Sequence, residues 1–263
     1  MKILVLMKKT PDTEAKIKIS GDGKGIDQAG LKFIINPYDE FAIEEALLTK
    51  EKNAGAEVVV VGLGDESMRE LFVKALGMGA DRAILVNNAG LEDADSATVA
   101  RILAAVVKSE NAQLVFTGRH AIDDDNMHVP AMVAEVLSWP HINVVGKFAL
   151  AGETVTAERA IEGGQVEVYE AKLPVVIGAD KSLNQPRFVS LPGLMKAKKK
   201  PLDVKTPSDF GADAAALKAK SHVKINSFRN PPEKPKGKMF KGEPVDVMVD
   251  KVVKLLREEA KVI

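Results

Sequence analysis

The stretch that decides the fold runs from Glu158 to Lys200 and reads ERAIEGGQVEVYEAKLPVVIGADKSLNQPRFVSLPGLMKAKKK. Polar and apolar residues alternate in two runs at its beginning, on either side of Gly163-Gly164. These runs are Thr154–Ile161, which starts four residues before the stretch, and Gln165–Tyr169, and the pattern predicts an antiparallel hairpin. Pro174–Ala179 is then almost entirely apolar, as a strand covered on both faces would be. After Pro186 the regular pattern stops, and an irregular arm begins.

This arm carries a short apolar tip followed immediately by lysines. The tip contains Leu191, Pro192, Leu194 and Met195, and the basic residues behind it are Lys196, Lys198, Lys199 and Lys200. Apolar side chains held beside prolines and lysines have no evident use inside a globular domain. We therefore predict that the tip docks into a partner protein and that the lysines steer an acidic partner toward it.

The composition narrows the possible functions. The chain has 263 residues, of which 46% are hydrophobic, and 37 basic side chains balance 37 acidic ones. A balanced charge argues against nucleic acid as the main partner. Cysteine is absent, which excludes thiolate catalysis and Cys-ligated zinc or iron–sulfur sites. Redox chemistry would need an organic cofactor, or a metal held by the four histidines and the acids.

The N-terminus, MKILVLMKKTPD, resembles the start of a signal peptide but has an apolar run of only five residues and no small-residue cleavage site. It fits a buried first strand better. No apolar run approaches the ~20 residues that span a bilayer. We expect a cytoplasmic protein that does not insert into membranes.

Buried strands alternate with helices over the first half of the chain. The predicted strands are Ile3–Met7, Val58–Val61, Ala83–Val86 and Leu114–Thr117, and Val99, Ile102, Leu103 and Val106 show helical spacing. Asn36 is expected to cap a helix that has Pro37 at its first position. The alternation predicts an α/β fold with a Rossmann-like parallel sheet and flanking helices, a hairpin insertion and an extended C-terminal arm.

The domain organisation follows from these segments. We expect a nucleotide-binding α/β core over residues 1–185, a partner-recognition loop over 186–200, and an arm over 201–263. The arm is rich in Lys and Pro and ends in an amphipathic helix, Val245–Glu258, that we expect to dock on a distant surface.

Three turns that follow predicted strands could form a nucleotide pocket. They are Ala121–Asp125, Asn36–Asp39 and Leu63–Asp65, and all three would lie at the carboxyl edge of the sheet, where open α/β folds bind ligands. A helix starts behind the first turn and offers free N–H groups to a phosphate. The alternative is that these residues only cap helices. His120 and His128 fit no standard metal-ligand spacing, and no Ser/His/Asp set or phosphate loop is recognisable, so we predict no metal site and no catalytic residues.

Several motifs together resemble the beta subunit of electron transfer flavoprotein along nearly the whole chain. They are Asn36-Pro37-Tyr38-Asp39-Glu40, Ala75-Leu76-Gly77-Met78-Gly79-Ala80-Asp81-Arg82, Ala121-Ile122-Asp123-Asp124-Asp125 and, most specifically, Leu183-Asn184-Gln185-Pro186-Arg187 through Leu191-Pro192 to Met195-Lys196-Ala197-Lys198.

The resemblance implies an electron carrier in fatty acid oxidation, not an enzyme with bond-making catalysis of its own. Members form a heterodimer with an alpha subunit that holds the redox FAD, take electrons from acyl-CoA dehydrogenases and pass them to a membrane quinone oxidoreductase. Leu191 matches the leucine that inserts into the dehydrogenase, and residues 201–263 would wrap the alpha subunit. A structural AMP would contact Leu6, Asn36, Pro37, Tyr38, Asp39, Leu63, Ala121, Ile122, Asp123, Asp124, Asp125, Asn126, Met127, His128, Val129, Pro130, Ala131 and Met132.

The chain departs from the family at two places. Met127-His128-Val129-Pro130 replaces the usual Asn-Gln-Thr-Gly, which removes a hydroxyl and an N–H from the phosphate site. Ala160 stands where mitochondrial relatives carry an acid. An alternative is the electron-bifurcating branch of the family, whose beta subunit binds a second FAD in place of AMP. Asp123-Asp124-Asp125 agrees with the AMP type, and the residues after it agree with neither.

Overall fold

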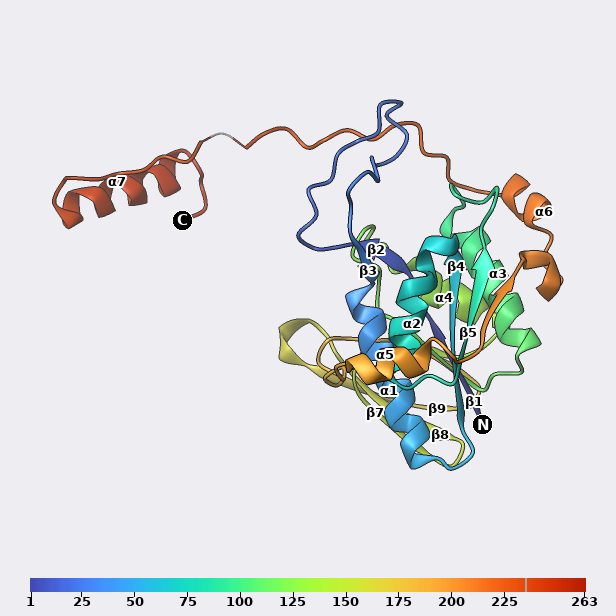
Figure 1. Ribbon diagram of the computed structural model, residues 1–263. Helices are drawn as coiled ribbons and strands as arrows, with labels where there is room; N and C mark the ends of the chain where they lie inside the picture. Colours follow the sequence, from blue (N-terminus) through green and yellow to red (C-terminus); the bar gives the residue numbers. More distant parts are fainter. Residues whose placement is uncertain (235) are drawn as a thin grey trace. The chain divides into compact units, whose positions relative to one another are not determined.

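The computed structural model describes residues 1–234 and 236–263. The chain divides into two compact units, Met1–Phe228 and Arg229–Ile263. The first unit is built on a sheet with helices on both of its faces (Figure 1).

The main sheet has nine strands within the described residues, in the order β11-β5-β4-β1-β6-β10-β7-β8-β9. The strands from β11 to β7 are parallel, and β7, β8 and β9 form an antiparallel extension. Their bounds are β1 Lys2–Leu6, β4 Glu57–Gly64, β5 Arg82–Asn87, β6 Leu114–Gly118, β7 His141–Ala151, β8 Thr154–Ala160, β9 Val166–Lys172, β10 Val175–Ala179 and β11 Leu202–Lys205. A second, small sheet pairs β2 (Lys9–Pro11) with β3 (Phe33–Ile35).

Helices cover both faces of this sheet, as the near-continuous apolar strands predict. Alternate residues of β1 face opposite cores: Ile3 and Val5 join α1 (Pro37–Lys52) and α2 (Arg69–Met78), while Leu4 and Leu6 join α3 (Ser96–Ser109) and α4 (His128–Leu137). Shorter helices are α5 Leu191–Ala197 and α6 Ala214–Ala219, and single 3-10 turns are η1 Glu66–Met68, η2 Glu162–Gly164 and η3 Pro207–Phe210. The α/β architecture predicted from the sequence is confirmed.

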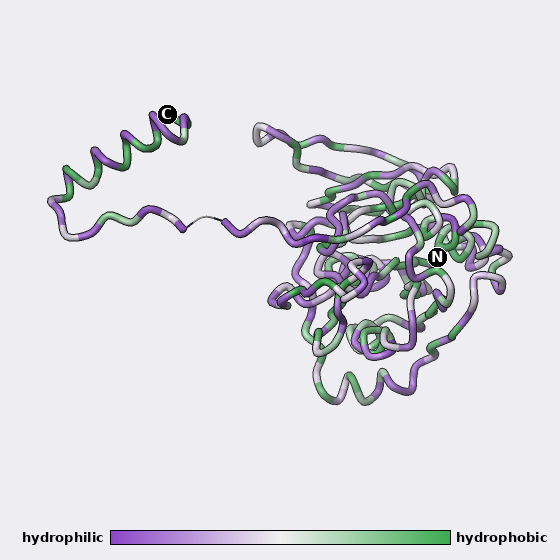
Figure 2. The backbone as a smooth tube through the Cα atoms, turned by 90° about the horizontal axis from the view of Figure 1, so that it is seen from above, coloured by the Kyte–Doolittle hydropathy of each residue, from purple (hydrophilic) through white to green (hydrophobic). Residues whose placement is uncertain are grey.

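The second unit contains the predicted terminal helix, α7, with the expected bounds Val245–Glu258. Hydrophilic and hydrophobic stretches alternate along it (Figure 2), and Val245, Val249, Val252 and Leu256 are exposed. In the part of the chain that the structure describes, no helix is long and apolar enough to cross a membrane.

Two strands of the main sheet, β7 and β11, are not among the predicted ones. β7 pairs with β10 at His141 and Ile142, turns at Val144 (φ 60°), and continues outward beside β8, so its sequence mixes core and surface residues without a clear period. β11 adds a short edge strand beside β5 in a segment that we had assigned to the extended arm. Here only Leu202 and Val204 alternate with polar residues, which is too short a signal to separate a strand from a tail.

Gly62 and Gly64 in β4 have a packing role. A Cβ built on Gly62 would lie 2.8 Å from both the Met7 carbonyl oxygen and Met68 Cε, and one on Gly64 would lie 2.3 Å from Met68 Sδ. The two glycines therefore let the loop after β1 and the 3-10 turn η1 approach the strand closely. This explains the Gly-x-Gly pair without a dinucleotide-binding role.

Replacing Gly62 with alanine is expected to destabilise the fold by about 1–3 kcal/mol, because the new methyl group overlaps a backbone oxygen that cannot move freely. Chemical unfolding of the purified chain measures this. Gly21→Ala is the matched control, since its Cβ meets nothing within 4 Å. Equal stability of the two variants would contradict the packing role of Gly62.

Candidate functional site

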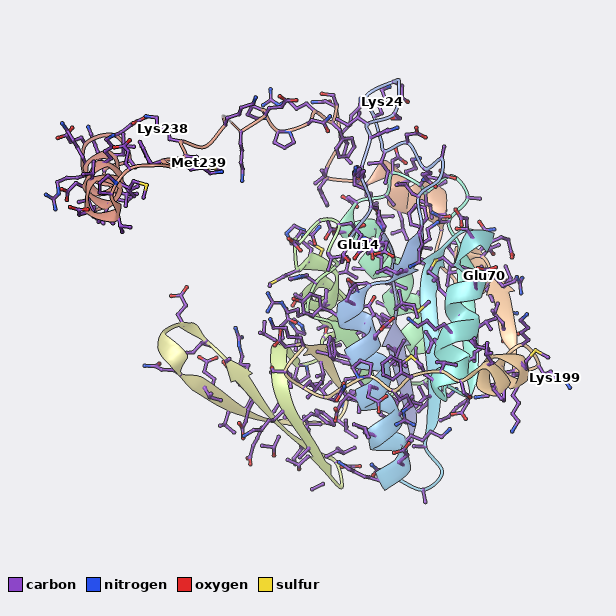
Figure 3. All side chains as sticks on the ribbon, turned by 60° about the vertical axis from the view of Figure 1, so that its left-hand side comes forward. Glu14, Lys24, Glu70, Lys199, Lys238 and Met239 are labelled. Atoms are coloured by element: carbon purple, nitrogen blue, oxygen red, sulfur yellow. The ribbon has the colours of Figure 1, made fainter. Side chains whose placement is uncertain are left out.

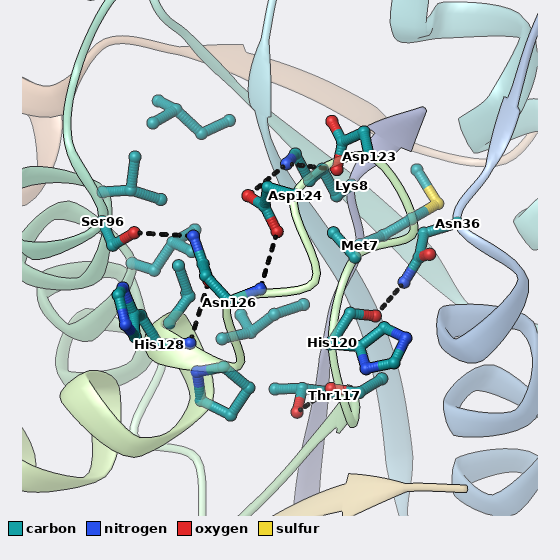
Figure 4. A pocket seen from close by; sticks show the side chains of 18 of the residues that line it. Met7, Lys8, Asn36, Ser96, Thr117, His120, Asp123, Asp124, Asn126 and His128 are labelled. Carbon is teal, nitrogen blue, oxygen red and sulfur yellow. Dashed lines mark hydrogen bonds and ion pairs between the residues drawn. The ribbon is translucent and has the colours of Figure 1, made fainter. Parts of the chain in front are cut away.

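A cavity of about 480 Å³ opens at the carboxyl ends of β1, β4, β5 and β6 (Figure 4). This is the edge at which the three predicted turns were expected to meet, and the volume is ordinary for a small-molecule site. Twelve of the predicted residues line it: Leu6, Asn36, Asp39, Leu63, Ala121, Asp123, Asp124, Asn126, Met127, His128, Val129 and Pro130.

The other predicted residues lie beside the cavity and do not line it: Pro37, Tyr38, Ile122, Asp125, Ala131 and Met132. Two of them support its wall. The Tyr38 ring packs edge-on against the His120 ring, with 4.5 Å between the ring centroids. The Ile122 N–H donates to Asn36 Oδ1 at 3.2 Å. His120 Nε2 lies 3.3 Å from Asp125 Oδ1.

Sequence reasoning missed about half of the wall: Met7, Lys8, Asn88, Leu91, Glu92, Ala94, Ser96, Val99, Leu103, Thr117, Gly118, His120 and Ile225. Two of these residues could have been predicted from their positions in the sequence. Asn88 follows β5 and Ser96 begins α3, so the rule that placed the other three turns at this edge applies to the β5–α3 connection too. Ile225 had no such signal, because it lies more than 90 residues further along the chain than Pro130.

Asn36 and Asp39 hold the cavity's inner wall together. Asp39 is buried, and its carboxylate accepts hydrogen bonds from Lys8 N (2.8 Å), Gly118 N (2.9 Å) and Asn36 Nδ2 (3.0 Å). Asn36 Nδ2 also donates to His120 O (2.9 Å). These bonds connect the end of β1, the start of α1 and the loop after β6.

Asn36 is the N-cap residue of α1 and Pro37 is its first residue, as predicted, but the Asn36 side chain makes no capping hydrogen bond. Its amide is used instead on Asp39 and on the backbone of His120 and Ile122, where it links two distant segments.

Lys8 offsets part of the negative charge of the acidic turn. Its amine contacts Asp123 at 2.8 Å and Asp124 at 3.1 Å (Figure 4). Burial alone would lower the pKa of Lys8, but the hydrogen bonds and charges of Asp123 and Asp124 raise it above its ordinary value. The site therefore holds a fixed cation between two carboxylates, which reduces the repulsion that an anionic ligand would meet there but does not cancel it.

The loop into α4 is strained and held by Asn126. Asp125 (φ 51°) and Met127 (φ 57°) both adopt left-handed backbone conformations, which cost about 1–2 kcal/mol each for such residues. The Asn126 side chain accepts from His128 N at 3.0 Å and donates to Ser96 Oγ at 3.4 Å.

Helix α4 begins at His128, so Pro130 is its third residue. Proline has no N–H, but an N–H at this position would have had no partner within the helix. The N–H of Val129, in the same first turn, is also without a partner inside the helix.

The apolar tip forms the short helix α5. Ser190 caps it by accepting from Gly193 N, Leu191 is 79% exposed and Met195 is 68% exposed. Pro192 is also exposed, and Leu194 is half-buried against Gly77. Phe188, which was not singled out from the sequence, is 98% exposed just before this helix.

The lysines behind the tip do not all face solvent. Lys196, Lys198 and Lys199 are exposed, and Figure 3 shows Lys199 at the outer side of α5. Lys200 instead donates to Leu76 O (3.0 Å) and Ala80 O (2.6 Å) at the end of α2. Burial lowers the pKa of Lys200, and its amine stabilises α2 rather than presenting a free charge.

Arg187 anchors the base of the tip to α1. Its guanidinium contacts both oxygens of the buried Glu44 carboxylate (2.8 and 2.9 Å) and Glu51 (2.8 Å). Asn184 adds bonds to Phe41 O and Glu45 Oε2, both at 3.0 Å. A bidentate, partly buried pair of this kind fixes orientation as well as position, so the exposed tip stands on a rigid base.

The ionisation of Asp39 is expected to control stability near neutral pH. Burial raises the pKa of Asp39 to about 7, from 3.8 for the ordinary side chain, although its three hydrogen bonds and Lys8 oppose that shift. The folded state therefore holds this proton more tightly between pH 4 and 7. The contribution to stability is complete below pH 4 and is lost as the pH rises through 7.

Asp39→Asn removes the titrating carboxyl group. It also places an amide NH₂, which is a donor, against backbone N–H groups that need an acceptor. We expect it to lower the unfolding free energy at pH 7 by about 1–3 kcal/mol. The fall in stability between pH 5 and 7 should also become shallower, by up to about 1.4 kcal/mol per pH unit. Urea unfolding at several pH values measures both effects; parallel pH profiles for the two proteins would contradict the assignment.

Comparison with known proteins shows the family of this chain. The family model for the electron transfer flavoprotein domain matches residues 24–210. The chain is 42% identical over 262 residues to the electron transfer flavoprotein subunit beta of Syntrophomonas wolfei, covering 100% of this chain and 98% of the relative. It is 42% identical over 264 residues to that of Bacillus subtilis (100% of both), and 38% identical over 239 residues to that of Homo sapiens (90% of this chain, 91% of the relative). The chain belongs to the electron transfer flavoprotein beta-subunit family.

Proposed function

We propose that this chain pairs with an electron transfer flavoprotein alpha subunit that holds most of the FAD site, and that its own cavity binds AMP. FAD, when bound, supplies the redox chemistry of the complex. The present chain makes and breaks no bonds; it provides a rigid scaffold, a nucleotide that stabilises it, and a docking surface.

The cavity has both apolar and polar lining residues, which supports an adenine mononucleotide as its ligand. Leu6, Leu63, Leu91, Val99 and Leu103 offer an apolar surface to a base. The first turn of α4 offers a backbone N–H to the phosphate, and the Lys8 amine, paired with Asp123 and Asp124, lines the same cavity. Asp123 and Asp124 would accept hydrogen bonds from ribose hydroxyls.

The observation that carries the electron-transfer proposal is the anchored tip. Leu191, Met195 and Phe188 are strongly exposed on a segment that Arg187 and Ser190 hold in one conformation. Leaving these apolar side chains in water is unfavourable unless a partner covers them. We propose that an acyl-CoA dehydrogenase of the cytoplasm is that partner and delivers electrons to the flavin, which a membrane quinone oxidoreductase then oxidises.

The second unit provides a separate contact. The apolar side chains Val245, Val249, Val252 and Leu256 lie along one stripe of α7 and are all exposed. We propose that residues 229–263 dock on the alpha subunit through this stripe.

Leu191→Ala is expected to lower the efficiency of electron transfer from the dehydrogenase at least tenfold, as loss of a central interface side chain does, without changing the flavin content of the heterodimer. Steady-state reduction of the flavin by the dehydrogenase measures this. Val204→Ala is the control, since Val204 is exposed on β11 away from the tip. Unchanged transfer in the Leu191 variant would remove the docking role.

Reversing the exposed charges, Lys198→Glu with Lys199→Glu, should slow association with the dehydrogenase about tenfold or more at low salt and much less at high salt, because screening weakens steering. Stopped-flow kinetics at two ionic strengths tests this. The pair Lys16→Glu and Lys18→Glu, both exposed in the loop between β2 and β3, changes the same charge elsewhere and should leave the rate unchanged. A rate loss independent of salt would argue against steering.

A further inference from the structure

We propose that residues 220–228, here called the strap, form the outer wall of the nucleotide cavity and that Ile225 contacts the bound nucleotide. This inference rests on the proposed function. Ile225 lines the cavity together with Leu91, Val99 and the loop into α4. It would be a further binding residue, far from the three sheet-edge turns along the chain.

The strap is tied down at its first end. Before it, α6 lies on α3: Thr98 Oγ1 donates to Leu217 O at 3.3 Å, and the Lys218 amine donates to Gly90 O at 2.8 Å and contacts Asp93 at 2.7 Å. His222 N then donates to Asp95 Oδ2 at 2.7 Å. Asp95 Oδ1 simultaneously accepts from Thr98 N as the cap of α3. One carboxylate therefore fixes both the helix start beside the cavity and the beginning of the strap.

The strap is also tied at its far end. Phe228 N donates to Gly23 O at 2.7 Å, in the loop between β2 and β3. Figure 1 shows this orange segment leaving α6 and reaching that dark-blue loop. Phe228 is the sixth residue after His222, so the chain between the two bonded N–H groups can span at most about 20 Å. Within this short segment, Ile225 lines the cavity.

Ile225 is the part of the strap that meets the cavity. It is 51% exposed, whereas its neighbour Val223 is 64% exposed and does not line the cavity. The surrounding sequence, Lys218 to Lys224 and Asn226 to Ser227, is otherwise mostly polar. A half-exposed aliphatic side chain at a cavity mouth gains free energy when a flat apolar ligand surface such as a purine covers it. The geometry thus favours the base or the sugar over the phosphate as the group that Ile225 contacts.

The test compares Ile225→Ser with the matched control Val223→Ser in the heterodimer. Release of radiolabelled AMP is followed after dilution into unlabelled AMP. We expect release about five- to tenfold faster for Ile225→Ser, as loss of one apolar contact predicts, and the wild-type rate for Val223→Ser. Wild-type release from Ile225→Ser would overturn the role of Ile225 while leaving AMP binding intact. A wild-type heterodimer that takes up no AMP would overturn the proposed function as well.

A second measurement does not depend on substitution. Hydrogen exchange of the peptide covering residues 219–228 is compared in the heterodimer stripped of nucleotide and in the heterodimer saturated with AMP. Slower exchange with AMP, at least threefold at the strap amides, is expected if the ligand packs against this segment. Equal exchange in a heterodimer that demonstrably holds AMP would contradict the proposal.

Discussion

The buried carboxylate of Asp39 is the constraint on which the rest of the first unit depends. It lies where three segments distant in sequence meet, and it satisfies the backbone N–H groups of Lys8 and Gly118 that would otherwise be buried without a partner. Gly118 has to be glycine here, because a Cβ would lie 2.5 Å from Asp39 Oδ1. The carboxyl ends of β1 and β6 are thereby held beside the start of α1, which opens the cavity at a fixed place on the sheet edge.

Helix α1 links this cavity to the docking tip. Its first residues form the cavity wall, and Glu44, Glu45 and Glu51 further along hold Arg187 and Asn184 at the base of the tip. The buried Glu44 would be unfavourable without its bidentate partner, so the position of the tip and the stability of the helix depend on each other. The proposed nucleotide, bound at one end of α1, would therefore help to hold the proposed docking tip through a helix that both share.

Much of the fold could be predicted from the sequence, because parallel strands buried on both faces leave apolar runs that few other structures share. The convergence of the three sheet-edge turns followed from the same rule. The features that were not predicted are set by tertiary contacts: the cross-link made by the Asn36 side chain, the inward turn of Lys200, and the pairing of β11. Each depends on a partner that is distant along the chain, and local propensity carries no information about it. Ile225 reaches the cavity for the same reason, through the hydrogen bonds that the His222 and Phe228 N–H groups donate to Asp95 Oδ2 and Gly23 O.

The most direct test of the account is the nucleotide content of the heterodimer. The chain is purified with its alpha subunit and denatured, and the released nucleotides are separated by chromatography and quantified. The account predicts one FAD and one AMP per heterodimer. Two FAD and no AMP would contradict it: the cavity beside Lys8 and Asn126 would then hold a flavin dinucleotide, and the complex would belong to the electron-bifurcating type.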